Sequence, residues 1–295
     1  MKNIILNNSK YRILIIGANG MIGHTLFNYF SKQTHLETVG LIRELISNFD
    51  NKTNIIEEKN FTNPDILKTI IDYTSPNLLI NCVGIVKQNP KIIDIEHSLY
   101  LNSIFPKLLN QICKNKKIRF LTFSTDCIFS GQKGLYKEDD LADAKDSYGM
   151  TKYLGEINED NDSITLRTSF IGKELNTKRG LLEWILSESK LSKTIYGFKN
   201  AIFSGLPTVE IARIINEYII PNVSLKGLYH LSSEPIDKYT LLNLIKETYS
   251  LDININENYD RFIDRSLNSS KFRAATGFKP LSWKELVKRM YENNL

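Results

Sequence analysis

The residues with the clearest capacity for chemistry are a tyrosine and a lysine that lie one helical turn apart. In Tyr148-Gly-Met-Thr-Lys152 both side chains fall on the same face of a predicted helix over residues 147–158. A free phenol has a pKa of about 10, which suits it poorly to proton transfer near neutrality. An ammonium beside it favours the phenolate and lowers that pKa. Among the 14 tyrosines only Tyr148 has a lysine four positions later, so chance does not explain the spacing. The pair therefore predicts acid–base catalysis.

A hydroxyl group follows a predicted strand upstream of this pair. Thr125 comes directly after the strand 118–124 and is expected to hydrogen-bond a substrate carbonyl that Tyr148 protonates. Ser124 is the rival donor, and either hydroxyl could simply cap the end of the strand. Asn102 lies in a long predicted helix, where it either supports a water relay to Lys152 or is a satisfied core asparagine.

A glycine-rich turn follows the first predicted strand, 12–17, and opens the first helix, 21–32. Its residues are Gly17, Ala18, Asn19, Gly20, Met21, Ile22 and Gly23. Glycine at such a turn lets the backbone approach a pyrophosphate, whose charge is stabilised by unpaired N–H groups at the helix N-terminus. Glycines also serve plain tight turns, but this position in an alternating chain predicts dinucleotide binding.

The end of the second predicted strand, 36–42, indicates which dinucleotide is bound. Proteins that prefer NAD usually carry an acidic residue there for the ribose 2′-hydroxyl, whereas this chain has Arg43, which could pair with a 2′-phosphate. We therefore expect NADPH (NADP+), although Arg43 could also be an ordinary surface residue. Asn60 and Phe61 lie where an adenine is usually flanked, or else pack as loop residues. Lys152 is also expected to hydrogen-bond the nicotinamide ribose, and Thr125 to face the nicotinamide.

These residues must be positioned by an α/β fold. Strands alternate with helices up to residue 172, which predicts a Rossmann-type doubly wound parallel sheet. We expect this NADP-binding domain over residues 10–172, with about 205–232 returning to it. A smaller C-terminal lobe that binds the substrate is expected over 173–204 and 233–295. Further strands are predicted at 78–83, 163–169 and 227–231, and further helices at 64–73, 96–114, 181–189, 208–218, 237–249 and 282–291, while 264–280 shows little periodicity.

Composition sets broad limits on the class of protein. The chain has 295 residues, 42% hydrophobic and 24% charged, and its net charge of +5 is spread among acidic residues. Nucleic-acid binders usually gather lysine and arginine on one stripe, so no nucleic-acid partner is expected. Three separated cysteines, with no metal-site spacing, no signal peptide and no long apolar run, predict a cytoplasmic protein without a metal or a membrane partner.

The chain resembles the extended short-chain dehydrogenase/reductase family, and more narrowly the dTDP-4-dehydrorhamnose reductase group. The likeness covers residues 12–291 and rests on the segments 17–23, 81–84, 124–126, 129–131, 148–152, 166–168, 265–271 and 276–278. It implies a Thr125, Tyr148 and Lys152 triad, cofactor contacts from Cys82, Val83 and Gly84, and a nucleotide-sugar-binding lobe. The implied reaction is NADPH-dependent reduction of the 4-keto group of a UDP- or dTDP-linked 4-keto-6-deoxyhexose in deoxysugar and polysaccharide biosynthesis. Similar enzymes are commonly homodimers.

One residue departs from the simple rhamnose reductases, which usually have an aromatic residue at the position of Cys127. The sequence Thr125-Asp-Cys127-Ile-Phe129 is closer to bifunctional epimerase-reductases, in which this cysteine moves protons on the carbon beside the keto group. A 4-ketone acidifies the hydrogens at C3 and C5, so a thiol can act there as acid or base. We therefore expect C3 epimerisation before reduction, with a small buried hydrophobic residue as the alternative role for Cys127.

The resemblance extends to a subgroup that carries out the 3-epimerase/4-reductase step towards UDP-N-acetyl-L-rhamnosamine, through residues 82–88 and 201–206. The second proton carrier of such enzymes has no clear match, and Lys87 and Lys178 are the candidates.

The smaller lobe should supply cations for a nucleoside diphosphate. Arg265 is best placed by resemblance, with Lys271 and Arg273 as further candidates, and each could instead be a solvated surface charge. Trp184 and Phe203 could stack on a base or sugar, although aromatic residues at such positions more often belong to the core.

Two other functions compete with a reductase. One is a nucleotide-sugar epimerase or dehydratase that retains NAD, which Arg43 and the lone Asp126 after Thr125 argue against. The other is a non-catalytic NADP-binding regulatory subunit, which would have no reason to keep the triad.

Overall fold

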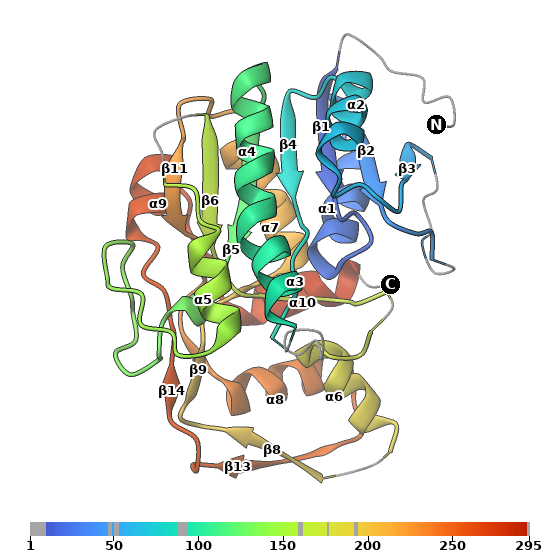
Figure 1. Ribbon diagram of the computed structural model, residues 1–295. Coiled ribbons are helices and arrows are strands. Elements are labelled where there is room, and N and C mark those ends of the chain that lie inside the picture. The colour runs from blue at the N-terminus through green and yellow to red at the C-terminus, as the bar shows by residue number, and fades with distance from the viewer. Residues whose placement is uncertain are drawn as a thin grey trace.

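A parallel sheet of seven strands forms the centre of the molecule, shown in the computed structural model of Figure 1. The structure describes residues 10–46, 49, 53–87, 94–158, 162–175, 177–191 and 194–293. The strand order is β11-β6-β5-β4-β1-β2-β3, and every pairing is parallel. The strands are β1 (Tyr11–Ile16), β2 (Leu36–Ile42), β3 (Ile55–Glu57), β4 (Leu78–Asn81), β5 (Arg119–Ser124), β6 (Ser163–Arg167) and β11 (Gly227–His230). This confirms the predicted Rossmann-type fold.

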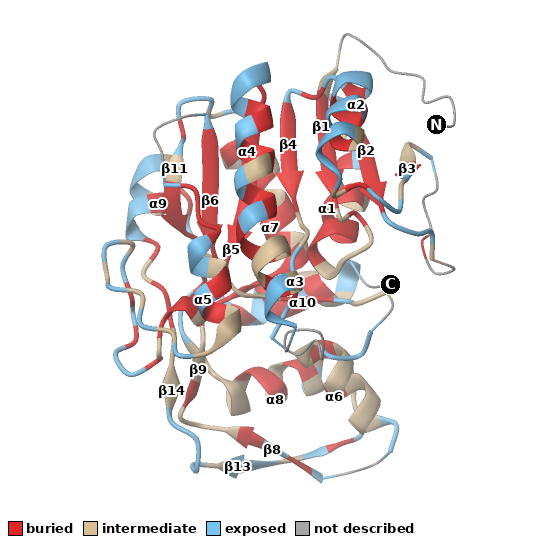
Figure 2. Ribbon diagram, in the orientation of Figure 1, coloured by how far each residue is buried: buried red, intermediate tan, exposed pale blue. Residues whose placement is uncertain are grey.

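The central strands are buried on both faces, as Figure 2 shows. In β1 the side chains alternate between two hydrophobic clusters: Ile13 and Ile15 belong to one, and Leu14 and Ile16 to the other. A strand buried on both sides has no polar alternation, which is why continuous apolar runs in the sequence predicted it.

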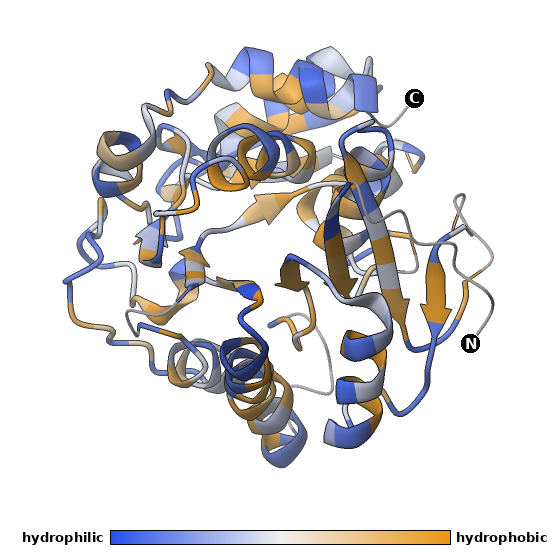
Figure 3. Ribbon diagram, turned by 90° about the horizontal axis from the view of Figure 1, so that it is seen from above, coloured by the Kyte–Doolittle hydropathy of each residue, from blue (hydrophilic) through white to orange (hydrophobic). Residues whose placement is uncertain are grey.

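Helices cover both faces of the sheet. On one face α1 (Met21–Ser31) packs against α7 (Thr208–Ile214), and α7 in turn packs against α10 (Trp283–Asn293). On the other face α2 (Pro64–Thr74) and α4 (Phe105–Lys116) contribute to the second cluster. Figure 3 shows the apolar strands between helices whose outer faces are hydrophilic. Because β2 and β4 flank β1, the chain reverses its winding direction between β1 and β4, and ligands bind at such switch points.

The predicted helix over 96–114 is interrupted in the structure. Helix α3 (Ile95–Leu99) passes through a π-helical turn, Tyr100–Ile104, into α4. A π-helical turn holds one extra residue, and such turns are frequent at functional sites. Here the turn contains Asn102, whose side chain bonds to a neighbouring segment instead of remaining within a regular helix.

A second group of elements lies below the sheet in Figure 1. It contains α6 (Leu181–Ser189), α8 (Lys238–Thr248), the parallel pair β8 (Thr194–Phe198) and β13 (Asn254–Asn258), and a small sheet ordered β12 (Ile236–Asp237), β9 (Ala201–Phe203), β14 (Ile263–Asp264). The remaining elements are α5 (Ser147–Leu154), the paired β7 (Phe170–Ile171) and β10 (Leu206–Pro207), and α9 (Ser270–Thr276). Among the described helices none is long and apolar enough to cross a membrane.

Candidate active site

The glycine-rich turn leaves β1 at the carboxyl edge of the sheet and enters α1. Gly17 has φ +83°, a conformation that side chains rarely adopt, and a Cβ atom on Gly23 would collide with the carbonyl oxygen of Gly17. Gly20 is the N-cap residue of α1, and no side chain there accepts a hydrogen bond from the first N–H groups of the helix. The first turn of α1 also holds no acidic residue. The first N–H groups of α1 therefore remain available to an anion such as a pyrophosphate.

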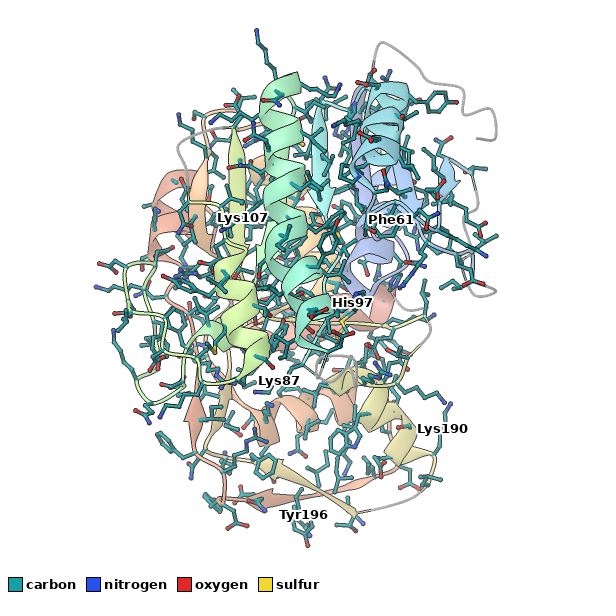
Figure 4. All side chains as sticks on the ribbon, viewed as in Figure 1. Phe61, Lys87, His97, Lys107, Lys190 and Tyr196 are labelled. Atoms are coloured by element: carbon teal, nitrogen blue, oxygen red, sulfur yellow. The ribbon has the colours of Figure 1, made fainter. Side chains whose placement is uncertain are left out.

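The neighbouring loops give partial support to the predicted nucleotide contacts. Arg43 is exposed directly after β2, and the Asn19 side chain donates to Glu44 O at 3.2 Å, so this arginine lies beside the glycine turn. Asn60 is also exposed. The ring of Phe61, labelled in Figure 4, is only 7% exposed and packs edge-on against Phe105, so the structure places it in the core rather than over an adenine.

The segment after β4 connects the glycine turn to the predicted lysine. A Cβ on Gly17 would meet Val83 Cγ2 at 3.0 Å, and Cys82 is half-buried beside it. A Cβ on Gly84 would lie 3.0 Å from Asn102 Oδ1 and 3.9 Å from Lys152 Nζ. Gly84 is exposed, so a ligand can approach its backbone.

Tyr148 and Lys152 lie on α5, which is fixed at its start by two contacts. Asp146 Oδ1 accepts the Gly149 N–H at 2.9 Å and caps the helix. A side chain on Gly149 would collide with Cys127 O, so the helix packs directly on the loop after β5. That loop carries Thr125, whose hydroxyl is hydrogen-bonded with Tyr148. The structure thus brings together the three residues of the predicted triad.

The pKa of Tyr148 differs from the expectation. Burial, with further contributions from Cys127 and Asp126, raises the pKa of the phenol above its ordinary value, and the hydrogen bond with Thr125 only partly opposes this. The sequence predicted a lowered pKa, but Lys152 directs its amine to Phe123 O at 2.6 Å. The tyrosine consequently keeps its proton at neutral pH, which is the form that can donate to a carbonyl.

Lys152 is half-buried, and burial lowers its pKa to about 8 although Glu156 opposes the shift. Glu156 was not singled out from the sequence, despite lying four residues after Lys152. Its carboxylate makes a bidentate ion pair with Arg167, with both N–O distances 2.8 Å. Ser124 also donates to Glu156 Oε1 at 2.6 Å. The rival hydroxyl therefore points into this buried network, which leaves Thr125 as the donor at the site.

Asn102 is fully engaged with protein groups. Its Oδ1 accepts Ile85 N–H at 2.9 Å, and its Nδ2 donates to Ile85 O and to Thr151 Oγ1, both at 3.1 Å. Both amide hydrogens are used, so the side chain ties the segment after β4 to α5. It acts as a structural support beside Lys152, and no water relay is needed to explain its burial.

Cys127 lies two residues after Thr125, in a single 3-10 turn, Asp126–Ile128. Burial and the neighbouring Asp126 raise the pKa of its thiol to about 12, while Arg265 opposes the shift. Arg265 Nη1 lies 3.8 Å from Cys127 Sγ, and its Nε donates to Phe129 O at 2.7 Å. The thiol of Cys127, which its raised pKa keeps protonated at neutral pH, thus lies next to Tyr148 and the Arg265 guanidinium.

The other predicted substrate residues are not all brought to this place. Lys87, labelled in Figure 4, forms an ion pair with Asp146 at 2.7 Å, and Lys178 is exposed. Lys271 donates to Leu228 O near the amino end of β11, the opposite edge of the sheet, so the structure separates it from the triad. This corrects its assignment to the substrate site.

Both predicted aromatic residues take part in packing. Phe203 lies 5.7 Å from Trp283 between ring centroids, and Trp184 packs partly buried against the core. Arg273 is held by Glu234 at 2.9 Å. In the described part of the chain no group of three or more metal-ligating side chains is gathered in one place.

Comparison with known proteins gives one family match over nearly the whole chain. The RmlD substrate binding domain matches residues 11–295. The dTDP-4-dehydrorhamnose reductase of Aggregatibacter actinomycetemcomitans is 23% identical, covering 95% of this chain and 98% of that protein. Methionine adenosyltransferase 2 subunit beta of Danio rerio is 22% identical, covering 81% and 74%.

Among solved structures, dTDP-4-dehydrorhamnose reductase from Bacillus anthracis in complex with NADP superimposes with a TM-score of 0.79 at 20% identity. The match covers 96% of this chain and 99% of that one.

Proposed function

The chain belongs to the RmlD substrate binding domain family, and from this premise we propose that it reduces the 4-keto group of a nucleotide-linked 4-keto-6-deoxyhexose with NADPH. The observation that carries the proposal is the convergence of Thr125, Tyr148 and Lys152 at the carboxyl edge of the sheet, beside the glycine turn. Relatives that bear the name dTDP-4-dehydrorhamnose reductase support the same reaction class.

The chain has a cradle that fits a dinucleotide. Gly17 and Gly23 leave no room for side chains, and the uncapped start of α1 offers N–H groups to a pyrophosphate. Arg43 would pair with a 2′-phosphate, in keeping with the NADP bound to the Bacillus anthracis structure. When bound, the nicotinamide supplies a hydride.

The protein's own residues handle the carbonyl and its proton. Thr125 would hold the keto oxygen, and Tyr148, whose raised pKa keeps it protonated, would donate its hydrogen to that oxygen. Lys152 would hold the ribose through its amine and keep a positive charge close to the phenol. On the substrate side, Arg265 would offer guanidinium donors to a diphosphate, since within the described part of the chain its Nε donates to Phe129 O and its Nη1 to Cys127 Sγ.

The proposal includes epimerisation at C3 before reduction. The thiol of Cys127 lies close enough to Tyr148 to interact with it, and its raised pKa keeps it protonated at neutral pH. A protonated thiol can return a hydrogen to a carbon beside the keto group. We also propose that residues 173–204 and 233–295 form the lobe that binds the nucleotide sugar, with UDP or dTDP as the nucleotide.

Likeness to a methionine adenosyltransferase subunit raises a second candidate, a regulatory NADP-binding protein. The assembled triad favours catalysis. An NAD-retaining epimerase is disfavoured by Arg43, which stands where such proteins carry an acidic residue.

Substitution of Tyr148 tests the proposed reaction. Tyr148→Phe should lower kcat for NADPH oxidation with UDP- or dTDP-linked 4-keto-6-deoxyhexose by about 10²–10⁴-fold, because the general acid is lost. Tyr153→Phe on the same helix is the matched control, since Tyr153 is 44% exposed, and it should retain activity. Undiminished turnover by Tyr148→Phe would refute the assignment, and NADPH binding by the wild type without any turnover would favour the regulatory alternative.

A further inference from the structure

A cavity of about 250 Å³ lies at the amino edge of the central sheet. It is lined by the second half of α4, by the start of β5 and by residues just before β6 and β11. In Figure 1 this is the upper end of α4, whereas α5, which carries Tyr148 and Lys152, lies near the lower end of the sheet. Sequence patterns do not point to this place, because its lining residues come from three separate segments of the chain.

The cavity is far from the candidate active site. Ile118 and Phe120 line it at the start of β5, and Thr125 follows the other end of the same strand. Thr125 comes seven positions after Ile118, so at about 3.3 Å per residue of a strand the two lie roughly 23 Å apart. A small molecule in the cavity therefore cannot reach Thr125 or Tyr148.

Three lysines line the cavity. Lys114 is in the last turn of α4, Lys117 is the C-cap residue of that helix, and Lys226 directly precedes β11. All three are exposed, and Asp162 is the single acidic residue among the described residues of the lining. Lys114 and Lys226 also interact with other groups of the protein. Ammonium groups around one cavity repel one another, and an anion among them relieves that repulsion, so the lining favours a negatively charged ligand.

The carboxyl end of α4 does not cancel this preference. Helix carboxyl ends repel anions through carbonyl groups that have no partner within the helix. Here Cys113 O accepts the Ile118 N–H at 2.9 Å, and Lys114 O accepts the Lys117 N–H at 3.3 Å. Lys117 has φ 56°, the left-handed conformation that closes a helix. Because these carbonyl groups are bonded, the lysine side chains determine the sign of the charge at the cavity.

A buried amide is the second feature that indicates a ligand. Asn110 on α4 is only 8% exposed, and among the described residues no group forms a hydrogen bond with its side chain. Buried amides are nearly always hydrogen-bonded, because an unpartnered one is costly. The amide atoms of Asn110 are not sealed from solvent, in contrast to the orphaned Oδ1 of Asn216. The Asn110 amide thus faces the cavity, where its Nδ2 can donate to an anion.

The inner wall of the cavity is apolar. Ile118 and Phe120 are buried and belong to the second hydrophobic cluster. The carbon skeleton of a ligand can lie against this wall and leave water, whereas a bare inorganic ion gains nothing from such a contact.

We propose that this cavity is a second ligand site, which binds a small organic phosphate of the size of a phosphorylated sugar. The phosphate group would lie among the three lysines and accept a hydrogen bond from Asn110, and the carbon skeleton would lie on the apolar wall. Pockets for drug-sized ligands measure about 300–1,000 Å³, so the volume here suits a smaller molecule. The ligand would bind without reacting, because the triad lies at the other edge of the sheet.

Calorimetric titration of glucose 1-phosphate into the full chain tests this site, with excess NADP+ present to occupy the glycine turn. Lys117→Met and Asn110→Leu should each raise Kd by about tenfold or more, because each removes a donor to the phosphate. Thermal melting without the sugar phosphate shows that each variant is folded. Inorganic phosphate at the same ionic strength should bind at least about threefold more weakly, since it has no carbon skeleton to place on the apolar wall.

Two control variants should bind glucose 1-phosphate like the wild type. Lys107→Met removes an exposed lysine from the same helix, α4, and Arg265→Met removes a cation from the candidate active site. Loss of binding in Arg265→Met but not in Lys117→Met would place the ligand in the active site and overturn the proposal.

Other results would also overturn it. If Lys117→Met and Asn110→Leu both bound glucose 1-phosphate with the affinity of the wild type, the ligand would lie elsewhere. If inorganic phosphate bound as tightly as glucose 1-phosphate, the cavity would hold an adventitious ion only. None of these results bears on the proposed reductase, which NADPH oxidation tests separately.

Discussion

Replacing Lys152 should make the protein more stable while abolishing its activity. The lysine amine is confined in a half-buried place where it donates to Phe123 O, and burial lowers its pKa from 10.5 to about 8. A native state that disfavours the charged amine is destabilised relative to the unfolded chain, in which the charge is solvated. Methionine has a similar length and no charge, so Lys152→Met removes this cost.

The size of the effect follows from the pKa difference. A shift of about 2.5 units corresponds to ~3 kcal/mol at pH 7, since each unit is worth about 1.4 kcal/mol. Loss of the hydrogen bond to Phe123 O should offset about 1 kcal/mol of this. We therefore expect the free energy of unfolding to rise by about 2 kcal/mol, which for a chain of this size is on the order of 4 °C in Tm.

The stability that Lys152→Met gains should depend on pH. Because the folded pKa is depressed, the cost is fully present below pH 8 and disappears as pH rises towards 10.5, where the unfolded chain also loses the proton. The stability gained by Lys152→Met should thus shrink by about 2 kcal/mol between pH 7 and pH 9.5. In the same window kcat/KM of the wild type should fall above about pH 8, as Lys152 becomes neutral.

Urea and thermal unfolding of the cofactor-free protein at the two pH values measure this effect. Lys107→Met is the control, because Lys107 is an exposed lysine on α4, labelled in Figure 4. If Lys152→Met were less stable than the wild type at pH 7, or if its stability difference did not change with pH, the reasoning from burial would be refuted.

Two further pairs of variants test the cofactor turn and the choice of hydroxyl. Gly23→Ala should weaken NADPH binding at least about 10-fold and lower Tm, because its methyl group would collide with Gly17 O, as titration and melting would show. Gly20→Ala should leave Tm of the cofactor-free protein nearly unchanged, since its Cβ would lie at an ordinary 3.4 Å from the same atom; equal melting of the two variants would contradict this. Thr125→Val should lower kcat by about 10²-fold with little effect on NADPH binding, whereas Ser124→Ala should mainly lower stability, by about 1–3 kcal/mol, because it leaves the buried carboxylate of Glu156 short of a donor. The reverse pattern would identify Ser124 as the donor.

The parts of this protein that sequence alone predicts are those specified by local pattern. The strand over 36–42 is predicted with the bounds that the structure shows, and it is buried throughout although it contains Glu37 and Thr38. The helix that carries Tyr148 and Lys152 was likewise expected from their spacing, although it ends at Leu154, earlier than predicted. In both cases the information lies within a few consecutive residues.

Long-range placement could not be predicted in the same way. Arg265 and Lys271 are two cations within one short segment, yet Arg265 reaches Cys127 while Lys271 binds Leu228 O at the other edge of the sheet. Strand β14, which ends just before Arg265, and helix α9, which contains Lys271, are too short to show periodicity, so their directions depend on contacts with distant residues. Spacing alone gives no information on which of two nearby charges faces a site.

Burial is the second property that the sequence left open. A lysine near a tyrosine is expected to lower the phenol's pKa, yet the pKa of Tyr148 is raised, because desolvation is the largest influence and the neighbouring Cys127, Asp126 and Asp146 act in the same direction. Desolvation depends on how α5 packs against the loop after β5, through a contact between Gly149 and Cys127 O. Charge spacing predicted which groups meet, and packing determined which of their protonation states is favoured.

In the proposed function, the loop after β5 would serve two steps of chemistry. Thr125 Oγ1 accepts the Cys127 N–H at 3.1 Å, and this bond turns the chain so that the threonine meets Tyr148 while the thiol meets Arg265. In the proposed reaction Thr125 would hold the keto oxygen and Cys127 would lie beside the adjacent carbon, and both residues belong to one capped turn. The proposed reduction and proton exchange would therefore use one bound ketone without the sugar moving between sites, since the same oxygen would remain held in both steps.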